Sequence, residues 1–296
     1  MSNETAIIIV NYYSWQLVCR CIESLNNHLK QDFKVIVVDN SDEPEGADIT
    51  TQHPEIELIT AKVNHGFAAG CNLGIKRALE GESDYVLLLN PDTRVDGDFL
   101  SAMIGLLEQN STIGMAGPKI VNDTPQRELW NGGGRLNWFA GGTRKIVGAN
   151  SSEQEVFEVS FLSGCVLLLR AEAVRDVGLL AEDYFLYFED TDYVQRFLSR
   201  GWQVVYTPGA VVIHSASATI GFQSELYVYY FSRNRIRFMR HWAKWYQYAV
   251  FMAFNTLVKL PGSLIIFGIL RRRPGLIKAY WQGYLHGLMG TGGRLV

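Results

Sequence analysis

The sequence predicts an α/β protein with a mostly parallel, Rossmann-like sheet that is covered by helices on both faces. Three apolar runs rich in β-branched residues, AIIIV at 6–10, KVIVVDN at 34–40 and YVLLLNPD at 85–92, are typical of buried parallel strands. Helical patterns separate these runs, as the crossovers of a parallel sheet require. With 296 residues, of which 48% are hydrophobic and 19% charged, the chain is long enough for one large domain and an appendage, or for two small domains.

The remaining elements continue this alternation. The first strand leads into a helix with an apolar stripe at Leu17, Cys21 and Leu25. A weak strand and a glycine-rich helix precede the strand at 85–92. After it the sequence predicts an amphipathic helix, a Gly- and Asn-rich loop or β-excursion, a strand, a short helix, a loop that leads into a helix, and one or two strands. These segments are residues 57–61, 64–79, 98–109, 122–158, 161–170, 171–180, 184–202 and 203–214.

Polar side chains stand at the carboxyl ends of three of the predicted strands. Asn11 follows the first strand, Asp39 ends the second, and Asn90 and Asp92 follow the strand that begins at residue 85. Ligands of parallel α/β sheets bind at this edge of the sheet. Because three separate strands share the pattern, we expect these side chains to line one cleft.

Residues 226–296 differ sharply in charge from the rest of the chain. They contain eleven Lys and Arg but no Asp or Glu, whereas the whole chain has a net charge of −3. The segment is also aromatic and helical in period, so we expect a domain at 1–225 and a helical, membrane-associating extension at 226–296. Lys259 and Pro261 interrupt its apolar stretches, which are shorter than the roughly 18 residues of a spanning helix. An anionic membrane surface is therefore the expected partner, and the alternative is that the aromatic side chains pack on the catalytic domain or form a dimer interface. Nucleic acid is not expected, because the segment is too apolar.

The cysteines and the N-terminal sequence indicate a cytoplasmic protein. Four cysteines are present without a CxxC pair or zinc-ligand spacing, which is typical of reduced, buried thiols. The first residues, MSNETAIIIVNYY, lack the basic region of a signal peptide and lead directly into a strand. We expect the protein on the inner face of the cell membrane, attached peripherally.

Glu189, Asp190 and Asp192 cluster at the start of a predicted helix. Such acids serve either as a general base or as helix caps that interact with the helix dipole. Three carboxylates this close together repel one another, so the pKa of at least one of them should be shifted if the site is shielded from water.

Two further residues suit a divalent metal. Asp92 follows a buried strand and offers the oxygen ligand that Mg²⁺ or Mn²⁺ prefers, although Asn-Pro and Asp also form simple turns. His214 ends a later strand and is either structural or a metal ligand. The segment NHGFAAGCNLG at 64–74 has glycines that allow close approach of a phosphate at a helix start, but it matches neither GxGxxG nor a Walker loop.

Taken together, six segments resemble the motif series of family 2 glycosyltransferases. In order they are VNYYS, VVDNSD, NHGFAAGCNLG, LLLNPDT, FLSGCVLLLR and FLYFEDTDYVQRFLSRGW. The forms NPD and FEDTD, with the tail YYFSRNRIRFMRH, resemble bacterial rhamnosyltransferases of O-antigen and cell-wall polysaccharide assembly. The resemblance covers residues 6–240 well and the last 55 residues more loosely.

The resemblance implies a GT-A fold and a set of site residues. Asn11 and Tyr12 would lie beside the nucleotide, and Asp39 would contact its base. Asn90-Pro91-Asp92 stands where the family has its metal-binding DxD motif, with one carboxylate instead of two. The residues implied to bind the nucleotide-sugar are Asn11, Tyr12, Asp39, Asn40, Asn64, Gly66, Asn72, Asn90 and Asp92.

The resemblance also implies roles in catalysis. Asp190 would be the general base, with Glu189 and Asp192 beside it, and Asp92 and His214 would hold Mg²⁺ or Mn²⁺. A single displacement by an acceptor hydroxyl inverts the anomeric carbon. The QxxRW motif of processive synthases is absent from the sequence, so we expect the addition of one sugar or very few.

The favoured donor is dTDP-rhamnose and the favoured acceptor is a glycan, expected to be linked to a polyprenyl diphosphate. Transfer of a galactofuranosyl or N-acetylhexosamine unit remains an alternative, and a homo-oligomer is possible. A sugar-phosphate nucleotidylyltransferase is disfavoured because NYYSWQ, after the first strand, has no glycine. A non-catalytic, membrane-docked binding protein is disfavoured by the intact acid cluster.

Overall fold

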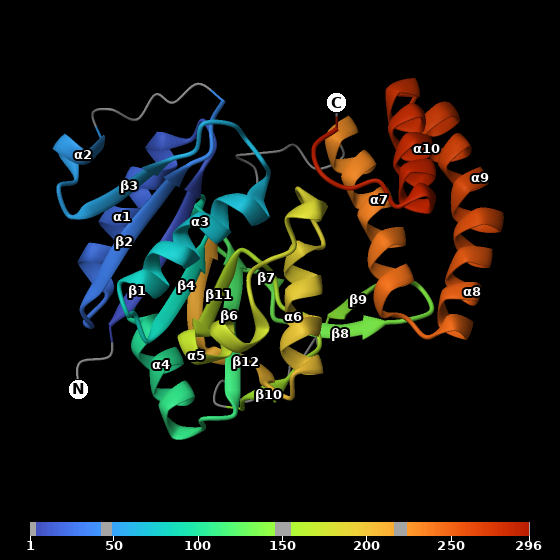
Figure 1. The fold of residues 1–296 in the computed structure, drawn as a ribbon. Coiled ribbons are helices and arrows are strands. Elements are labelled where there is room, and N and C mark those ends of the chain that lie inside the picture. Colours follow the sequence, from blue (N-terminus) through green and yellow to red (C-terminus); the bar gives the residue numbers. More distant parts are fainter. Residues whose placement is uncertain (1–3, 43–48, 146–154, 216–223, 296) are drawn as a thin grey trace.

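The computed structural model describes residues 4–42, 49–145, 155–215 and 224–295. A layered α/β body and a group of C-terminal helices lie side by side in it (Figure 1). The central sheet has ten strands, eight of them in the order β10-β12-β6-β11-β4-β1-β2-β3, with β5 paired to β12 and β7 to β6. The strand bounds are Thr5–Asn11 (β1), Phe33–Asp39 (β2), Ile56–Thr60 (β3), Tyr85–Leu89 (β4), Thr93–Arg94 (β5), Ile113–Asn122 (β6), Leu129–Asn131 (β7), Phe157–Glu158 (β10), Val166–Arg170 (β11) and Gln203–His214 (β12).

The first half of the sheet is parallel, as predicted. β1 pairs in parallel with both β2 and β4, and β2 pairs in parallel with β3. β6 and β12 form another parallel pair, but β11 lies antiparallel between β4 and β6. The sequence VLLLR of β11 is buried on both faces, so its apolar pattern is the same for either strand direction.

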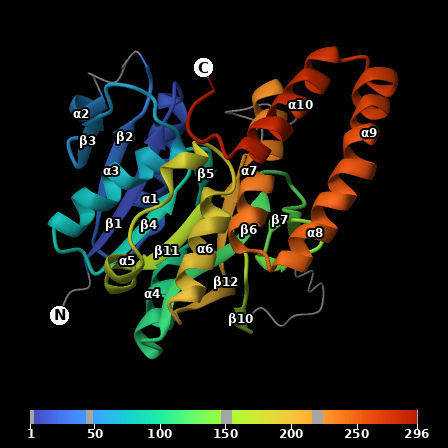
Figure 2. The same ribbon diagram turned by 45° about the vertical axis from the view of Figure 1, so that its right-hand side comes forward.

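Helices cover both faces of this sheet (Figure 2). Alternate side chains of the strands point into two separate cores because successive residues of a strand face opposite sides. The helices α1 (Trp15–His28) and α4 (Phe99–Gln109) close one core, and α3 (Phe67–Glu80), α5 (Ala171–Val177) and α6 (Glu189–Ser199) close the other. The two short helices of the body are α2 (Ile49–Gln52) and η1 (Glu182–Tyr184).

The Gly- and Asn-rich stretch forms a β-excursion, as predicted for its described part. β8 (Gly134–Asn137) and β9 (Gly142–Lys145) make a separate two-stranded hairpin that reaches from the sheet toward the C-terminal helices (Figure 1). Trp138 at its turn stacks on Phe238 of the C-terminal helices, with ring centroids 5.8 Å apart. Residues 146–154 of the excursion lie outside the described residues, and β10 follows them at Phe157–Glu158.

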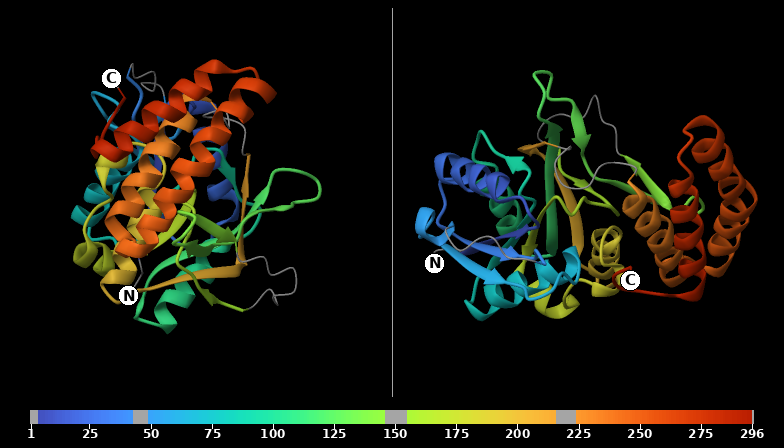
Figure 3. Two further views of the ribbon diagram at one scale, coloured as in Figure 1. Left: turned by 90° about the vertical axis from the view of Figure 1, so that its right-hand side faces the viewer. Right: turned by 90° about the horizontal axis from the view of Figure 1, so that it is seen from above.

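The C-terminal segment folds into antiparallel helices beside the body (Figure 3). α7 (Glu225–Trp242) runs against α10 (Pro274–Met289). The two helices approach closely at glycines, since a Cβ at Gly283 would lie 2.4 Å from the carbonyl oxygen of Tyr229, and one at Gly287 would lie 2.9 Å from that of Arg233. Between them in sequence come α8 (Trp245–Phe254), η2 (Asn255–Lys259), α9 (Leu260–Ser263) and η3 (Leu264–Leu270).

The expected interruption at Lys259 and Pro261 is wrong. Residues Trp245–Leu270 form one continuous helix of 26 residues, whose most apolar 18-residue window has a mean hydropathy of 1.7. π-helical turns on both sides of the proline widen the helix there, which relieves the clash of a proline ring with the preceding turn. By length and composition this helix suffices to cross a membrane, although a single helix of this kind is weak support for crossing. Only 22% of its most apolar window is buried, so most of its apolar side chains face outward.

Candidate active site

The polar residues at the carboxyl ends of β1 and β2 come together, as predicted. The side-chain amide of Asn11 donates a hydrogen bond to Oδ1 of Asp39 over 3.0 Å, and both residues are fully buried. The Ser41 hydroxyl donates to the same oxygen over 2.7 Å. The second oxygen of Asp39, Oδ2, is buried without a hydrogen-bond partner among the described residues. The pair therefore retains one acceptor for a ligand at this edge of the sheet.

The asparagines beside this edge hold the loop that precedes α3. Asn40 donates to the side-chain oxygen of Asn64 and to the carbonyl of Gly66, and Asn64 accepts from the Gly66 amide over 2.8 Å. Gly66 has φ of +101°, and a Cβ there would lie 2.3 Å from the carbonyl oxygen of Phe185. This glycine is thus required for contact with the turn that precedes α6, and its predicted role toward a phosphate stays a prediction.

Asn72 uses its side chain within the protein. Its amide donates to the carbonyl of Leu180 and to Glu182, and its oxygen accepts from the Leu180 amide, each over 2.9 Å. Tyr12, by contrast, is half-buried and packs edge-on against Tyr13. Contacts of either residue with a donor stay predictions.

Asp92 and His214 come together after β4 and at the end of β12. Nε2 of His214 lies 3.3 Å from Oδ1 of Asp92, and both side chains are buried. The two atoms are close enough for an ion pair but do not form a hydrogen bond. Oδ1 of Asp92 has no hydrogen-bond partner among the described residues. Ligands at right angles around an ion with bonds of about 2.1 Å lie about 3 Å apart, so these two atoms fit adjacent positions on one divalent cation.

This pair offers one carboxylate oxygen and one imidazole nitrogen. Within the described part of the chain there is no group of three or more His, Cys, Asp or Glu residues that fits a metal ion. Mg²⁺ and Mn²⁺ complete their coordination with phosphate oxygens and water where a protein supplies only one or two ligands. The pair therefore suits a cation that binds together with a phosphorylated ligand.

The three acids at the start of α6 have three different environments. Asp190 accepts hydrogen bonds from the Gly164 amide over 2.9 Å and from the amide and hydroxyl of Thr191. Burial raises the pKa of Asp190, while these hydrogen bonds oppose that shift. The Gly164 contact places Asp190 beside the end of β4, because the adjacent Cys165 carbonyl accepts from the Asn90 amide.

Glu189 and Asp192 differ in how fully they are satisfied. Burial, with the charges of Asp190 and Asp192, raises the pKa of Glu189 well above the usual range, and its Oε2 atom has no hydrogen-bond partner in the described structure. Asp192 instead accepts from Trp242 over 2.8 Å and pairs with Arg196 over 3.0 Å. Asp192 thus joins the C-terminal helices to α6.

The turn that precedes these acids has a strained backbone, and side chains of α7 stabilise it. Phe185, Tyr187 and Phe188 have φ of 63°, 66° and 73°, a conformation that costs about 1–3 kcal/mol for each non-glycine residue. The fully buried side-chain amide of Asn234 donates to the carbonyls of Tyr184, Leu186 and Tyr187 at 2.8–2.9 Å.

The neighbouring Arg233, also fully buried, donates to the Tyr184 carbonyl over 2.8 Å. Helix α7 therefore fixes the position of the acidic helix α6. The sequence analysis did not identify Arg233 and Asn234 as site residues. An adjacent Arg-Asn pair within an aromatic helix was nevertheless a signal, because polar side chains in an apolar helix usually form hydrogen bonds with buried polar groups.

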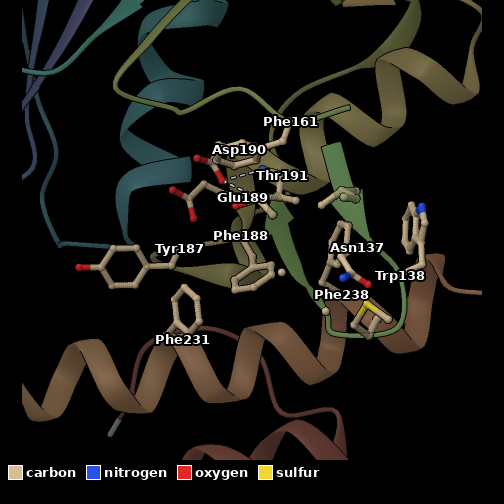
Figure 4. A pocket seen from close by; sticks show the side chains of 15 residues that line it. Asn137, Trp138, Phe161, Tyr187, Phe188, Glu189, Asp190, Thr191, Phe231 and Phe238 are labelled. Atoms are coloured by element: carbon tan, nitrogen blue, oxygen red, sulfur yellow. Dashed lines mark hydrogen bonds between the residues drawn. The ribbon is translucent and has the colours of Figure 1, made fainter. Parts of the chain in front are cut away.

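A cavity of about 160 Å³ opens beside Asp190 (Figure 4). The loop at 187–191, the β8–β9 hairpin and α7 form its walls, which are mostly aromatic. Sequence reasoning placed no ligand there, because the three elements are far apart in the chain.

Comparison with known proteins identifies the fold and its chemistry. The family profile described as "Glycosyl transferase family 2" matches residues 6–178, more than half of the chain. Among solved structures, that of GalNAc-T7 with UDP, GalNAc and Mn²⁺ is similar with a TM-score of 0.67 at 14% identity. The similarity covers 82% of this chain and 48% of that protein, so this chain spans about half of its length.

Three curated relatives are similar in sequence. The low-salt glycan biosynthesis hexosyltransferase Agl10 of Haloferax volcanii is 24% identical over 99% of this chain and 94% of its own. The N-acetylglucosaminyl-diphospho-decaprenol L-rhamnosyltransferase of Mycobacterium tuberculosis is 26% identical over 75% and 79%. The dTDP-rhamnosyl transferase RfbF of Shigella flexneri is 25% identical over 72% and 69%.

The role of α7 can be tested at Asn234. Asn234→Ala removes the side-chain donor of the Leu186 and Tyr187 carbonyls, whereas the Tyr184 carbonyl keeps its bond from Arg233, so we expect a loss of about 1–3 kcal/mol in the free energy of unfolding. Urea denaturation and circular dichroism would measure it. Asn26→Ala, which removes an exposed hydrogen bond to Glu55, is the control and should change little. Equal stability of the two variants would contradict the proposed support of the turn.

Proposed function

This chain belongs to glycosyl transferase family 2, and from that premise we propose that it is an inverting, metal-dependent rhamnosyltransferase. It is a glycosyltransferase of glycan synthesis, as its relatives are. The observation that carries the finer proposal is a group of buried polar atoms without hydrogen-bond partners in the described structure. They lie on strand-end residues and at the start of α6, where a polar ligand would satisfy them: Asp39 Oδ2, Asn90 Oδ1, Asp92 Oδ1, Glu189 Oε2 and His214 Nδ1.

The donor we propose is dTDP-rhamnose. Two of the relatives are named as rhamnosyl transferases, and one of them as a dTDP-rhamnosyl transferase. The forms NPD and FEDTD in this sequence support the same choice. Asn11 and Asp39 are the proposed contacts of the nucleotide base, with Tyr12 at the rim. A different hexose is the second candidate, because the relative that aligns with 99% of this chain is named only as a hexosyltransferase.

A divalent cation, Mg²⁺ or Mn²⁺, would be held by Asp92 and His214, and it would neutralise the charge that develops on the departing diphosphate. The 3.3 Å separation of their ligand atoms supports this assignment. The structure of GalNAc-T7 was determined with UDP, GalNAc and Mn²⁺, which supports metal use in this fold.

Asp190 is the proposed general base. Its carboxylate would take the proton of an acceptor hydroxyl as that oxygen bonds to the anomeric carbon and the bond to the diphosphate oxygen breaks. One displacement inverts the configuration and leaves dTDP as the product. The hydrogen bonds from Gly164 and Thr191 hold the carboxylate in place, and its raised pKa makes it a stronger base than an exposed aspartate.

The proposed acceptor is a glycan on a polyprenyl diphosphate, reached from the cytoplasmic face of the membrane. The mycobacterial relative is named for such a lipid-linked substrate. The long C-terminal helix exposes Trp245, Leu257, Ile269 and Leu270, each at least 69% accessible, and three arginines follow it at 271–273. Apolar side chains beside basic ones favour the surface of an anionic membrane.

The donor assignment predicts measurable nucleotide binding. Calorimetric titration with dTDP in the presence of Mn²⁺ should give a saturable signal, and EDTA should weaken it because the cation bridges protein and diphosphate. Asp92→Ala should weaken the binding to a similar degree. Absence of binding to both dTDP and UDP, with metal present, would contradict the function. Full sugar transfer in the presence of EDTA would contradict only the proposed metal dependence.

The base assignment predicts different results at two neighbouring acids. Asp190→Asn should lower the rate of transfer by about 10²–10⁴ while dTDP binding and the melting temperature stay near wild type. Asp192→Asn should mainly lower the melting temperature, because it weakens the contacts to Arg196 and Trp242. If Asp192→Asn is inactive but stable and Asp190→Asn is active, the base has been assigned to the wrong carboxylate.

The membrane assignment predicts co-sedimentation with anionic vesicles that weakens at high salt. The double variant Leu257→Glu, Ile269→Glu should reduce it strongly, because both side chains are exposed and on the same helix. Leu129→Glu, at an exposed position of β7, is the matched control and should bind vesicles like the wild type. Equal sedimentation of all three proteins would count against docking through this helix.

A further inference from the structure

Trp130 contacts the side chain of His214, one of the two proposed metal ligands. The centroids of the two rings lie 4.3 Å apart and their planes are tilted by 51°, so the indole and the imidazole are in direct contact. Trp130 belongs to the Gly- and Asn-rich excursion, which also contacts the C-terminal helices through Trp138. The excursion therefore adds a side chain to the candidate metal site.

Strand β6 brings the two rings together. Its residue Asn122 pairs with His214 of β12, and its residue Ile120 pairs with Asn131 of β7. Because a strand has two edges, β7 and β12 flank the same end of β6. Neighbouring strands lie about 5 Å apart, so the side chains of Trp130 and His214 have to meet over β6.

An extra residue in β7 sets the direction of the Trp130 side chain. Leu129 and Asn131 pair with two adjacent residues of β6, so Trp130 between them is one residue more than the pairing requires. Such a β-bulge turns a side chain in a new direction, and bulges are frequent beside functional sites. Trp130 packs against the core that α1 and α4 close. His214 follows Val212 on the face of β12 that borders this core, because alternate residues of a strand share a face.

Among the described residues, none forms a hydrogen bond with the imidazole of His214. Nε2 lies 3.3 Å from Oδ1 of Asp92, and Nδ1 is buried without a partner. A histidine that binds a metal usually donates its other ring N–H to a carboxylate or a carbonyl, which fixes the orientation of the ring. Pairing with Thr93 of β5 fixes the backbone of His214 but not its ring. The contact with Trp130 is the one that restricts rotation of the imidazole.

An indole also suits the charge of a metal-bound imidazole. A cation at Nε2 draws electrons from the ring and leaves it partly positive. The π system of tryptophan attracts a positive group more strongly than the other aromatic side chains do. His214 and Asp92 are both buried, so little water competes with this attraction.

We propose that Trp130 positions His214 for binding of the divalent cation, in place of the hydrogen bond that Nδ1 lacks. The proposal rests on the metal-dependent function proposed above. An indole offers no ligand to a metal, so Trp130 acts through His214 and is a positioning residue. Ordinary core packing would make Trp130 important for stability alone, whereas a positioning residue changes the affinity for the metal.

The test measures how much Mn²⁺ strengthens the binding of dTDP. Calorimetric titrations with dTDP in Mn²⁺ and in EDTA give two dissociation constants, and their ratio is the metal enhancement. Trp130→Ala should lower this enhancement about tenfold, as loss of the support of a metal ligand does. The dTDP affinity in EDTA should stay near wild type. Trp130→Phe keeps a ring against the imidazole and should retain most of the enhancement.

Two further variants show whether Trp130 acts through His214. In a His214→Ala background, Trp130→Ala should cause no further loss of the metal enhancement, because the ligand that it positions is already missing. Trp130→Leu fills much of the same volume without a π system and replaces Trp130→Ala if circular dichroism shows that the alanine variant is unfolded. Leu129→Ala is the matched control, since Leu129 is the neighbouring residue of β7 and is 38% exposed. It should leave both dissociation constants unchanged.

The outcomes separate the role of Trp130 from the proposed function. If Mn²⁺ strengthens dTDP binding equally in wild type and in Trp130→Ala, the positioning role is wrong and the proposed function stands. Equal losses of dTDP affinity in Mn²⁺ and in EDTA, shared by Trp130→Phe, would show a purely structural role and would also overturn the proposal. If Mn²⁺ does not strengthen dTDP binding to the wild type, the proposed metal dependence has itself failed, and His214 has no cation to bind.

Discussion

The amide of Asn234 inside the turn at 184–188 is the contact on which the rest of the active site depends. Three residues of that turn have positive φ, so it is neither a regular helix nor a strand. The amides of Phe67 and Asp192 donate to the carbonyls of Phe185 and Phe188, but the carbonyls of Leu186 and Tyr187 need donors from a side chain. Asn234 and Arg233 supply the missing donors from α7. Without them the turn would bury unsatisfied carbonyls, and α6 would lose the position that brings its acids to the edge of the sheet.

This dependence gives the C-terminal helices a structural role in addition to the proposed contact with a membrane. Arg237 binds Asp183 and the Gly290 carbonyl, and Arg294 pairs with Asp42 of the body. Some of the basic side chains in the C-terminal segment therefore form contacts within the protein. These side chains contribute less to binding an anionic lipid surface. Most of the exposed large apolar side chains of the C-terminal segment belong to the helix at 245–270, which Figure 3 shows beside α7 and α10.

The three carboxyl groups at the start of α6 differ in hydrogen bonding and pKa because their surroundings differ. Asp192 is neutralised by Arg196 and bound by Trp242, so it is a structural link. Burial favours the neutral form of Glu189, in which a carboxyl group both donates and accepts hydrogen bonds, and its Oε2 atom has no partner among the described residues. Asp190 is hydrogen-bonded by Gly164 and Thr191 yet still has a raised pKa, a combination that suits a fixed base. Their spacing in the sequence alone does not separate these three environments.

The sequence by itself determined the strands, the family, and the strand-end residues that gather at one edge, because apolar runs and short motifs are local patterns. Asn11 and Asp39 came together as their positions at strand ends predicted, and Asp92 lies beside His214 as the family resemblance implied. Only the tertiary structure decided the antiparallel direction of β11, the continuity of the helix through Pro261, the support of the turn by Asn234, and the cavity under Trp138. Each of these depends on contacts between residues far apart in the chain, whose geometry is set by packing and leaves no periodic signal in the sequence.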